Sequence, residues 1–544
     1  MIKWLMRLTQ KHGFLASFIL AFILMAWDIG NLDAIRQGTE GFYLQISKEM
    51  NAAHSFLTPY FRGEPHWSKP PLHFWLPFPF YAVGFLETTT AARLSILLLS
   101  LFSIAYIASW VQRFFSIPKT TAALFFLSTI GFAKYSRIFM MEMPLSLLST
   151  LGSIFLFSAL IDQRRSDWLY ATLFCALSVL VKGPVAWVMI GGSFSIFLFL
   201  RQYFKQSIPY KKLLIFSLAT FALGSLWFVA CYIKYGQYFI DYFFLRENLG
   251  KFTSKPYPIR VVFQGLIIFS LPWSLFLPLV FNIENWKKRL TAVDKKFWPR
   301  VFVLSSFFVF FFLWLIPNQR SHHYAMPSIF FFLIILLDTM KCHHSPIKGI
   351  AASFSNLASS TLFFTLLPIL LMTFAFPSLF ESSSNILVML LAIAFTLFAF
   401  ISFFRKVSLR TRALSALLCF GFIWSFVTPL FVYPTVPDRV IKIVADRDLT
   451  VVYRKPYFIE EAIDRNGLLI INPQQISTRL YEVKDLLLIP ERVIKQQGLE
   501  SKIRTIDTWR VWQKSRKLSH ILDAISKSDL SILQESLMLV ELKR

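Results

Sequence analysis

Charged and aromatic side chains gather in the polar segments that separate the long apolar runs of this sequence. The segment YSRIFMMEMPL contains Arg137 and Glu142, and Lys182 follows in VKGP. Further polar groups lie in RENLGKF at 246–252 and NQRSHHYAMP at 318–327. Carboxylates can accept protons, and Lys and Arg bind anions through charge-assisted hydrogen bonds. Ionisable groups at the ends of apolar helices are costly and often functional, although each one could also extend to water. Together they predict a site at a membrane interface.

The apolar composition requires a lipid environment for the elements that carry these residues. Of the 544 residues, 56% are hydrophobic and 16% are charged, whereas soluble proteins contain about 25% charged residues. The formal net charge is +26. Its Lys and Arg residues form short clusters between apolar runs, which is typical of the loops of membrane proteins. No single basic face is apparent, and this argues against a nucleic-acid partner.

About thirteen apolar runs have roughly the 20-residue length of a membrane span. The stretch 72–88 is also apolar, but it carries several prolines, and we expect it to lie near the interface without crossing. The predicted spans are 14–29, 93–111, 119–135, 144–161, 167–182, 184–201, 211–232, 259–281, 299–316, 324–339, 355–376, 385–404 and 412–432.

Basic loops orient these predicted spans. Cytoplasmic loops are enriched in Lys and Arg, and alternate loops here are basic, as at 162–168, 201–212 and 284–300. This alternation of basic and less basic loops predicts a cytoplasmic N-terminus. An odd number of spans then places the C-terminal segment outside the cytoplasm, on the same side as the polar segments of the candidate site.

Two domains are expected. Residues 1–435 form an all-α polytopic membrane domain whose first outward loop, 30–92, contains interfacial helices. Residues 436–544 alternate strand-like runs with polar helical stretches, which is typical of a small α/β domain. The four cysteines lie within or beside apolar segments, no pair has metal-ligand spacing, and no structural disulfide is expected. His322 and His323 are adjacent, so they would not face each other on a helix, and a joint metal site is not expected.

Six short motifs occur in one order, and all fall on the predicted outer side. They are Thr39-Glu40 followed by Tyr43 and QISKEM; Lys69-Pro70-Pro71-Leu72; Arg137 with Glu142 and Pro144; Lys182-Gly183-Pro184; Glu247-Asn248 with Lys251 and Phe252; and Arg320 with Tyr324, Met326 and Pro327. In this combination the whole chain resembles the membrane-embedded GT-C glycosyltransferases that use polyprenyl-phosphate sugars. It is most similar to the lipid A aminoarabinose transferase family, which is related to the protein O-mannosyltransferases.

The resemblance implies transfer of a hexosyl or pentosyl group from a polyprenyl-phosphate donor, undecaprenyl phosphate being the expected carrier. The acceptor would be a hydroxyl group of lipid A, another glycan or a protein at the periplasmic face of the bacterial inner membrane. Cations would hold the donor phosphate and stabilise it as a leaving group. The implied phosphate ligands are Lys69, Arg137, Arg246, Lys251 and Arg320, and the implied pocket residues are Thr39, Tyr43, Lys182, Glu247, Asn248, His323 and Tyr324.

Two positions depart from the family pattern. Thr39 stands where the family has a catalytic Asp, and a hydroxyl group cannot act as a carboxylate base at neutral pH. The expected catalytic carboxylates are therefore Glu40, Glu142 and Asp33. Ser68 and Asn248 stand where the family pattern implies metal ligands, so no metal and no other cofactor is predicted.

Two other functions stay open from the sequence. Thr39 is compatible with a degenerate, non-catalytic homologue of the transferases. A transporter of lipid-linked sugars is a further alternative, but such proteins typically contain internal repeats and broken helices near the bilayer midplane. No repeat is evident here, and the polar residues gather at one face. The transferase is the function that the sequence favours.

Overall fold

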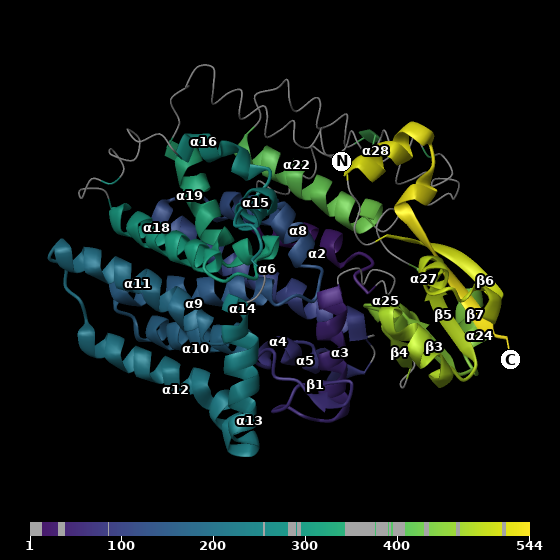
Figure 1. The fold of residues 1–544 in the computed structure, drawn as a ribbon. Helices are drawn as coiled ribbons and strands as arrows, with labels where there is room; N and C mark the ends of the chain where they lie inside the picture. Colours follow the sequence, from purple (N-terminus) through teal and green to yellow (C-terminus); the bar gives the residue numbers. More distant parts are fainter. Residues whose placement is uncertain are drawn as a thin grey trace. The chain divides into compact units, whose positions relative to one another are not determined.

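The chain forms two compact units in a computed structural model (Figure 1). The first contains Met1–Ile29, Leu44–Phe364 and Thr396–Phe422, and the second contains Gly30–Tyr43, Thr365–Phe395 and Ile423–Arg544. The structure describes residues 13–30, 38–84, 86, 88–253, 256–280, 290, 295–342, 376, 390, 393–394, 408–428, 435–463, 468–513 and 518–543.

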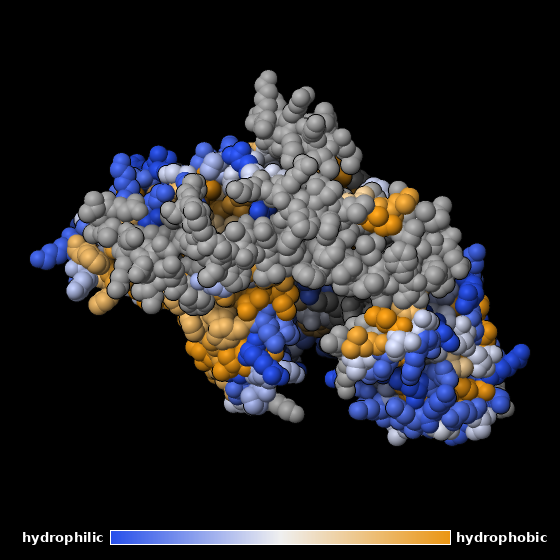
Figure 2. Space-filling view, turned by 90° about the horizontal axis from the view of Figure 1, so that it is seen from above, coloured by the Kyte–Doolittle hydropathy of each residue, from blue (hydrophilic) through white to orange (hydrophobic). Residues whose placement is uncertain are grey.

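Seven helices among the described residues are long and apolar enough to cross a membrane, and the protein is a multi-pass membrane protein. Large apolar side chains are exposed along the helix Tyr210–Tyr235, as for Leu218 at 61% and Phe221 at 60%, and this surface suits lipid. Apolar patches of this kind are orange in Figure 2 and hydrophilic ones are blue. Four of the seven are single helices: Thr88–Phe115 (α6), Glu142–Asp162 (α9), Val185–Tyr203 (α11) and Tyr210–Tyr235 (α12). The other three each join two elements: Phe297–Leu315 joins α18 (Phe297–Phe312) and η4 (Leu313–Leu315), His322–Lys341 lies within η5 (His322–Ser328) and α19 (Ile329–Cys342), and Leu409–Phe426 lies within α22 (Leu409–Phe422) and η7 (Ile423–Val427).

Three predicted spans differ from uninterrupted helices of full length. The run 119–135 is divided into α7 (Lys119–Leu127) and α8 (Ile130–Tyr135), because Thr129 leaves the helix and caps α8 by accepting a hydrogen bond from the Phe132 amide. The run 259–281 is divided into α15 (Arg260–Phe269), η3 (Trp273–Phe276) and α16 (Leu277–Val280), with Pro272, which has no amide hydrogen, before η3. The third, 14–29, contains α2 (Gly13–Ala26), which has 14 residues. The predicted span 167–182 lies wholly within the uninterrupted helix α10 (Arg165–Lys182), which carries three charged residues.

The predicted spans 355–376 and 385–404 fall almost wholly outside the described residues. The stretch 72–88 contains α4 (Leu72–Trp75) and α5 (Phe78–Val83), which follow Pro71 and Pro77. Helices of four and six residues are too short to cross a bilayer.

The segment between α2 and α6 contains α3 (Gly38–Ala52) and a small hairpin of β1 (Tyr60–Phe61) and β2 (Glu64–Pro65). Glu49 of α3 accepts hydrogen bonds from the turn, at 2.8 Å from the Arg62 amide and 3.0 Å from the Gly63 amide. This carboxylate fixes the turn just before the segment that contains Lys69.

The second unit contains a five-stranded sheet in the order β4-β3-β5-β7-β6. β3 is parallel to β4 and β5, whereas β7 is antiparallel to β5 and β6. The strands are β3 (Leu449–Val452), β4 (Leu469–Ile471), β5 (Leu486–Pro490), β6 (Ile503–Trp512) and β7 (Gln534–Leu542), and the longer helices with them are α24 (Asp438–Val444), α25 (Tyr457–Ile463), α27 (Glu491–Gln497) and α28 (Leu518–Lys527).

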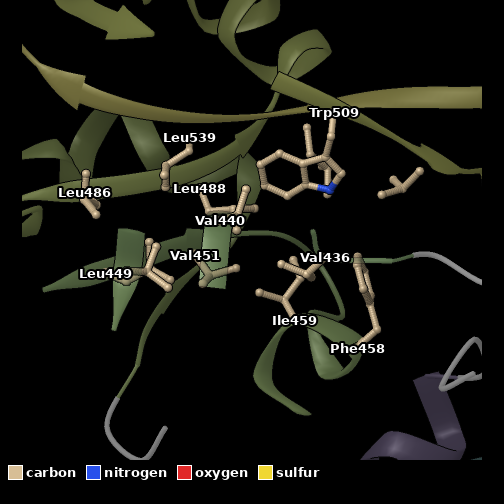
Figure 3. Close-up of a cluster of buried hydrophobic side chains, with 13 residues drawn as sticks. Val436, Val440, Leu449, Val451, Phe458, Ile459, Leu486, Leu488, Trp509 and Leu539 are labelled. Atoms are coloured by element: carbon tan, nitrogen blue, oxygen red, sulfur yellow. The ribbon is translucent and has the colours of Figure 1, made fainter. Parts of the chain in front are cut away.

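Both faces of this sheet are covered. Leu486 and Leu488 of β5 pack in one cluster with Trp509 (Figure 3), while Leu487 and Ile489 pack in the cluster of the opposite face. Such a continuous apolar run is typical of a strand buried on both sides. The sheet and its helices give the C-terminal segment the predicted α/β character.

The first turn of α3 also belongs to the second unit, where it packs tightly against α25. A Cβ atom added to Gly41 would lie 2.3 Å from the Cβ atom and 2.4 Å from the Cγ atom of Tyr457. Only glycine fits at this position without a shift of one element.

Candidate active site

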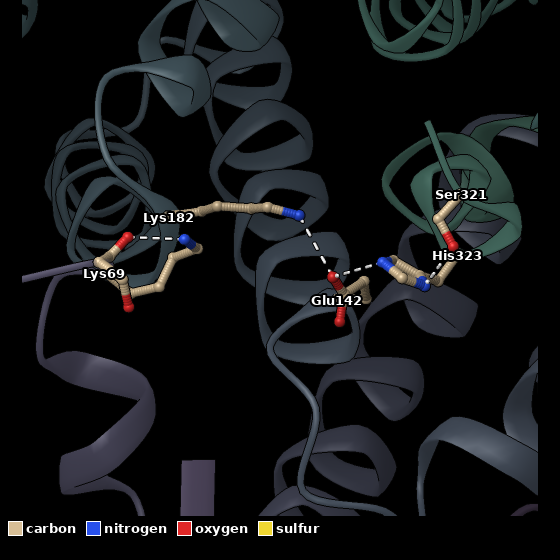
Figure 4. A network of polar contacts seen from close by, with 6 residues as sticks. Lys69, Glu142, Lys182, Ser321 and His323 are labelled. Carbon is tan, nitrogen blue, oxygen red and sulfur yellow. Dashed lines mark hydrogen bonds and ion pairs between the residues drawn. The ribbon is translucent and has the colours of Figure 1, made fainter. Parts of the chain in front are cut away.

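Glu142 forms the centre of a buried polar cluster in the first unit (Figure 4). Its Oε1 atom lies 3.3 Å from Lys182 Nζ and 3.5 Å from His323 Nε2. The Glu142 side chain is 4% exposed, and its Oε2 atom has no hydrogen-bond partner among the described residues. Glu142 is the first residue of α9, where the positive end of the helix dipole favours an anion. Three residues predicted from separate motifs are thus in contact.

Lys182 is held between this carboxylate and two aromatic rings. Its Nζ atom lies 4.5 Å from the ring centroid of Trp314 and 4.8 Å from that of Tyr324, within the range of cation–π attraction. Lys182 ends α10, and Gly183 follows with a φ of 91° that suits glycine. A Cβ at Gly183 would lie 3.1 Å from Phe243 Cζ and 3.9 Å from Pro70 Cγ. The Lys69-Pro70-Pro71 and Lys182-Gly183-Pro184 segments are therefore neighbours.

A second group of polar residues surrounds His66, which follows the hairpin of β1 and β2. The Tyr242 hydroxyl lies 2.9 Å from His66 Nδ1. Burial lowers the pKa of His66; the Glu247 carboxylate opposes this shift, and the Lys69 and Arg246 charges add to it. Two of the predicted phosphate ligands are thus brought near His66, which sequence reasoning missed.

Two other predicted phosphate ligands are engaged by backbone carbonyls. Arg137 Nη2 donates to the Trp27 carbonyl at 2.5 Å. Arg320 donates from Nε and Nη2 to the Leu315 carbonyl at 3.0 and 2.8 Å, and from Nη1 to the Tyr257 carbonyl at 2.6 Å. These contacts tie loop and helix ends together, so they favour a structural role for both guanidinium groups.

The remaining predicted residues fall in different places. Asn248 Nδ2 donates to the Phe243 carbonyl at 2.5 Å. Glu40 and Tyr43 are buried in α3 within the second unit, with Thr39 half-buried beside them, whereas Glu142 belongs to the first unit. Asp33 and the side chain of Lys251 lie outside the described residues.

His73 is a second residue that sequence reasoning missed. It follows Leu72 of the Lys69-Pro70-Pro71-Leu72 motif, is fully buried, and stacks on Phe139 with ring centroids 4.0 Å apart. Burial lowers the pKa of His73 to about 3, against the attraction of the Glu142 carboxylate. In the sequence, the feature that could have indicated His73 as a site residue is its position directly after the Lys69-Pro70-Pro71-Leu72 motif.

The residues at the expected metal-ligand positions do not suit a divalent cation. Ser68 and Asn248 carry no carboxylate or imidazole, and the amide of Asn248 is engaged by a carbonyl. No group of three or more His, Cys, Asp or Glu side chains that could hold a metal occurs in the part of the chain that the structure describes. Metal independence stays a prediction.

Comparison with known proteins finds a family model and several relatives that match different parts of the chain. The family model described as dolichyl-phosphate-mannose-protein mannosyltransferase matches residues 68–227. An uncharacterized protein of Aquifex aeolicus is 26% identical over 383 residues, which are 66% of this chain and 73% of that protein. Undecaprenyl phosphate-alpha-4-amino-4-deoxy-L-arabinose arabinosyl transferase 2 of Pseudomonas fluorescens is 24% identical over 51% of this chain, and the match spans half of that protein.

A solved structure extends the similarity to the complete fold. ArnT from Cupriavidus metallidurans, crystallised with undecaprenyl phosphate, superposes with a TM-score of 0.68 at 14% identity, covering 97% of this chain and 98% of that one. Because the sequence identity is low, this superposition establishes the fold alone. The chain has the ArnT fold and resembles the GT-C glycosyltransferases, with further similarity to the protein O-mannosyltransferases.

Proposed function

We propose that this protein is a glycosyltransferase that moves a sugar from a polyprenyl-phosphate donor, with undecaprenyl phosphate as the carrier, to a hydroxyl group. The acceptor is lipid A, another glycan or a protein at the periplasmic face of the bacterial inner membrane, with the N-terminus in the cytoplasm. The observation that carries the proposal is the contact of Glu142 with Lys182 and His323. A carboxylate with one oxygen held and the other without a hydrogen-bond partner among the described residues is suited to general base catalysis.

The reaction requires a proton acceptor and a stabilised leaving group. In the proposed step Glu142 Oε2 takes the proton of the acceptor hydroxyl, whose oxygen forms a bond to the anomeric carbon. The bond between that carbon and the phosphate oxygen breaks, and the electron pair leaves with the lipid phosphate. Direct displacement of this kind inverts the anomeric centre. Glu40 and Asp33 are the other candidates for the base.

Lys69 and Arg246 are the proposed ligands of the lipid phosphate. Both positive charges lower the pKa of His66, so each of the two cations acts on this imidazole. Lys69 Nζ donates to the Ser68 carbonyl at 2.6 Å (Figure 4), and its ammonium group carries the positive charge that suits a phosphate. Two cations near the phosphate would stabilise the charge that develops as the glycosidic bond breaks.

A binding measurement tests the phosphate site without knowledge of the sugar. Purified protein in lipid nanodiscs is titrated with undecaprenyl phosphate and examined by native mass spectrometry. Lys69→Ala should weaken binding by about 10-fold or more, since it removes a charge-assisted contact. Lys205→Ala removes an exposed lysine of another loop and should bind as the wild type does. Equal affinity of Lys69→Ala and the wild type would refute the phosphate assignment.

Transfer is tested in a strain that lacks the gene. Lipid A and envelope glycoproteins are compared by mass spectrometry after complementation with the wild type, Glu142→Gln or the control Glu64→Gln, whose carboxylate is exposed on the hairpin. The wild type and Glu64→Gln should restore a sugar adduct, and Glu142→Gln should lower its rate of formation by about 100-fold or more. The non-catalytic alternative, for which Thr39 is the motivating residue, predicts no adduct from any of the three proteins.

A further inference from the structure

We infer that His323 and Ser321 form a positioning pair that fixes the Glu142 carboxylate, so that Oε1 is held and Oε2 serves as the proton acceptor. The inference deepens the proposed function and rests on it. It assigns a role in the reaction to Ser321, and it gives His323 a role other than contact with the sugar.

The first observation is the distribution of contacts over the two carboxylate oxygens. Lys182 Nζ and His323 Nε2 approach the same atom, Oε1, at 3.3 and 3.5 Å (Figure 4). Oε2 is buried and has no hydrogen-bond partner among the described residues. The Lys182 hydrogen bond and the His323 contact come from different elements and meet at one oxygen, so a turn of the carboxylate would disturb both. Oε2, which takes part in neither contact, is the oxygen that we assign to the acceptor hydroxyl.

The second observation is that His323 is itself held by a third group. Ser321 Oγ lies 2.9 Å from His323 Nδ1, and the ring meets that of Tyr324 edge to face at a centroid distance of 5.0 Å. When the serine hydroxyl donates to Nδ1, the remaining ring proton lies on Nε2, the atom 3.5 Å from Glu142 Oε1. A catalytic group oriented by a second group, which a third group orients in turn, is the arrangement found in activated catalytic centres.

The third observation is that the backbone carrying this pair is fixed against the helices on both sides. Ser146, one turn after Glu142 in α9, donates to the Met326 carbonyl of η5 (His322–Ser328) at 2.7 Å. On the other side, a Cβ atom added to Gly265 of α15 would lie 2.0 Å from the His322 carbonyl oxygen. The short helix η5 therefore has little freedom to move, and a site held by rigid elements keeps its geometry through the reaction.

The test compares variants at His323 and Ser321 that differ in the contact they make with the Glu142 carboxylate, directly or through the imidazole. His323→Ala removes the contact to Oε1, whereas His323→Gln keeps an amide nitrogen near the place of Nε2. Ser321→Ala leaves the imidazole but removes its partner. His322→Ala is the matched control, because His322 is the adjacent histidine and its side chain is exposed. Each variant is produced in the deletion strain at equal protein amount.

Two quantities are measured for each variant: the rate of adduct formation in membranes with their endogenous lipid-linked donors, and the affinity of the purified protein for undecaprenyl phosphate. We expect His323→Ala to lower the rate by about 10- to 100-fold, as misplacement of a catalytic group does, with unchanged affinity. Ser321→Ala should lower it less, His323→Gln should recover most of the rate, and His322→Ala should match the wild type.

The outcomes separate this inference from the proposed function. If the wild type forms adduct and His323→Ala is equally fast, the positioning role is refuted while the transferase stands. If His323→Ala and His323→Gln both lose affinity for undecaprenyl phosphate, His323 is a phosphate ligand and the inference is also refuted. Absence of adduct from the wild type refutes the proposed function itself. As a control, thermal unfolding of His323→Gln and Ser321→Ala is measured to check that both variants are folded.

Discussion

The substitution Gly41→Ala tests the tight packing of α3 against α25 in the second unit. In an open helical position, alanine stabilises by about 0.5–1 kcal/mol relative to glycine. Here the new Cβ would lie 2.3, 2.4 and 2.8 Å from three atoms of Tyr457, whereas carbon atoms prefer separations of about 3.5–4.0 Å. Relief requires a shift of about 1 Å, and overpacking of this kind costs about 1–3 kcal/mol. We expect a net loss of about 1–2 kcal/mol in the free energy of unfolding.

A double-mutant cycle with Tyr457→Gly measures this clash directly. Tyr457→Gly removes the Cβ atom that Gly41→Ala meets, so the cost of Gly41→Ala should fall by about 1–2 kcal/mol in that background. Tyr457→Ala keeps the Cβ atom and should relieve less. Gly191→Ala is the control, since Gly191 lies in α11 with no atom within 4 Å of an added Cβ.

The assay is urea unfolding of the purified protein in detergent, followed by near-ultraviolet circular dichroism, with limited proteolysis reporting on the C-terminal segment. The expected order of stability is Gly191→Ala at or above the wild type, and Gly41→Ala below it. A Gly41→Ala protein as stable as Gly191→Ala, with no coupling to Tyr457→Gly, would refute the packing argument.

Two further predictions concern the first unit. Arg300 Nε lies 2.8 Å from Asp338 Oδ2 with both side chains buried, so Arg300→Met should destabilise by about 3–5 kcal/mol because it removes one partner of a buried ion pair. Thermal unfolding should show that adding Asp338→Leu restores most of this loss, and a double variant no better than Arg300→Met would contradict that reason. Gly183→Ala places a Cβ at a φ of 91° and 3.1 Å from Phe243, so it should slow adduct formation at least 10-fold by displacing the end of α10. Gly84→Ala also has a positive φ but open space around it, and its rate should equal that of the wild type; similar rates for both glycine variants would remove the packing at Gly183 as the cause.

The local chemistry of the sequence was enough to predict the class of the fold. Runs of about 20 apolar residues specify membrane helices because no other local structure satisfies the backbone in lipid, and alternating apolar and polar runs indicated the C-terminal sheet. Prolines indicated that 72–88 would not form a span, and the structure has two short helices there. The run 119–135 was less informative, because hydropathy does not report the hydrogen bond of Thr129 that starts a new helix.

For the candidate site too, the sequence indicated the residues and the tertiary structure decided which of them are in contact. Residue type and order alone marked Glu142, Lys182 and His323 as candidates, because carboxylates, cations and imidazoles beside apolar helices are costly to keep without a purpose. Their contact was decided only by the packing of α9, α10 and η5, which brings together residues up to 181 positions apart. Arg320 was a candidate for the same chemical reason, but in the tertiary structure its guanidinium group donates hydrogen bonds to the Leu315 and Tyr257 carbonyls. A sequence lists the donors and acceptors, and the fold decides which of them meet, since a hydrogen bond requires atoms within about 3 Å.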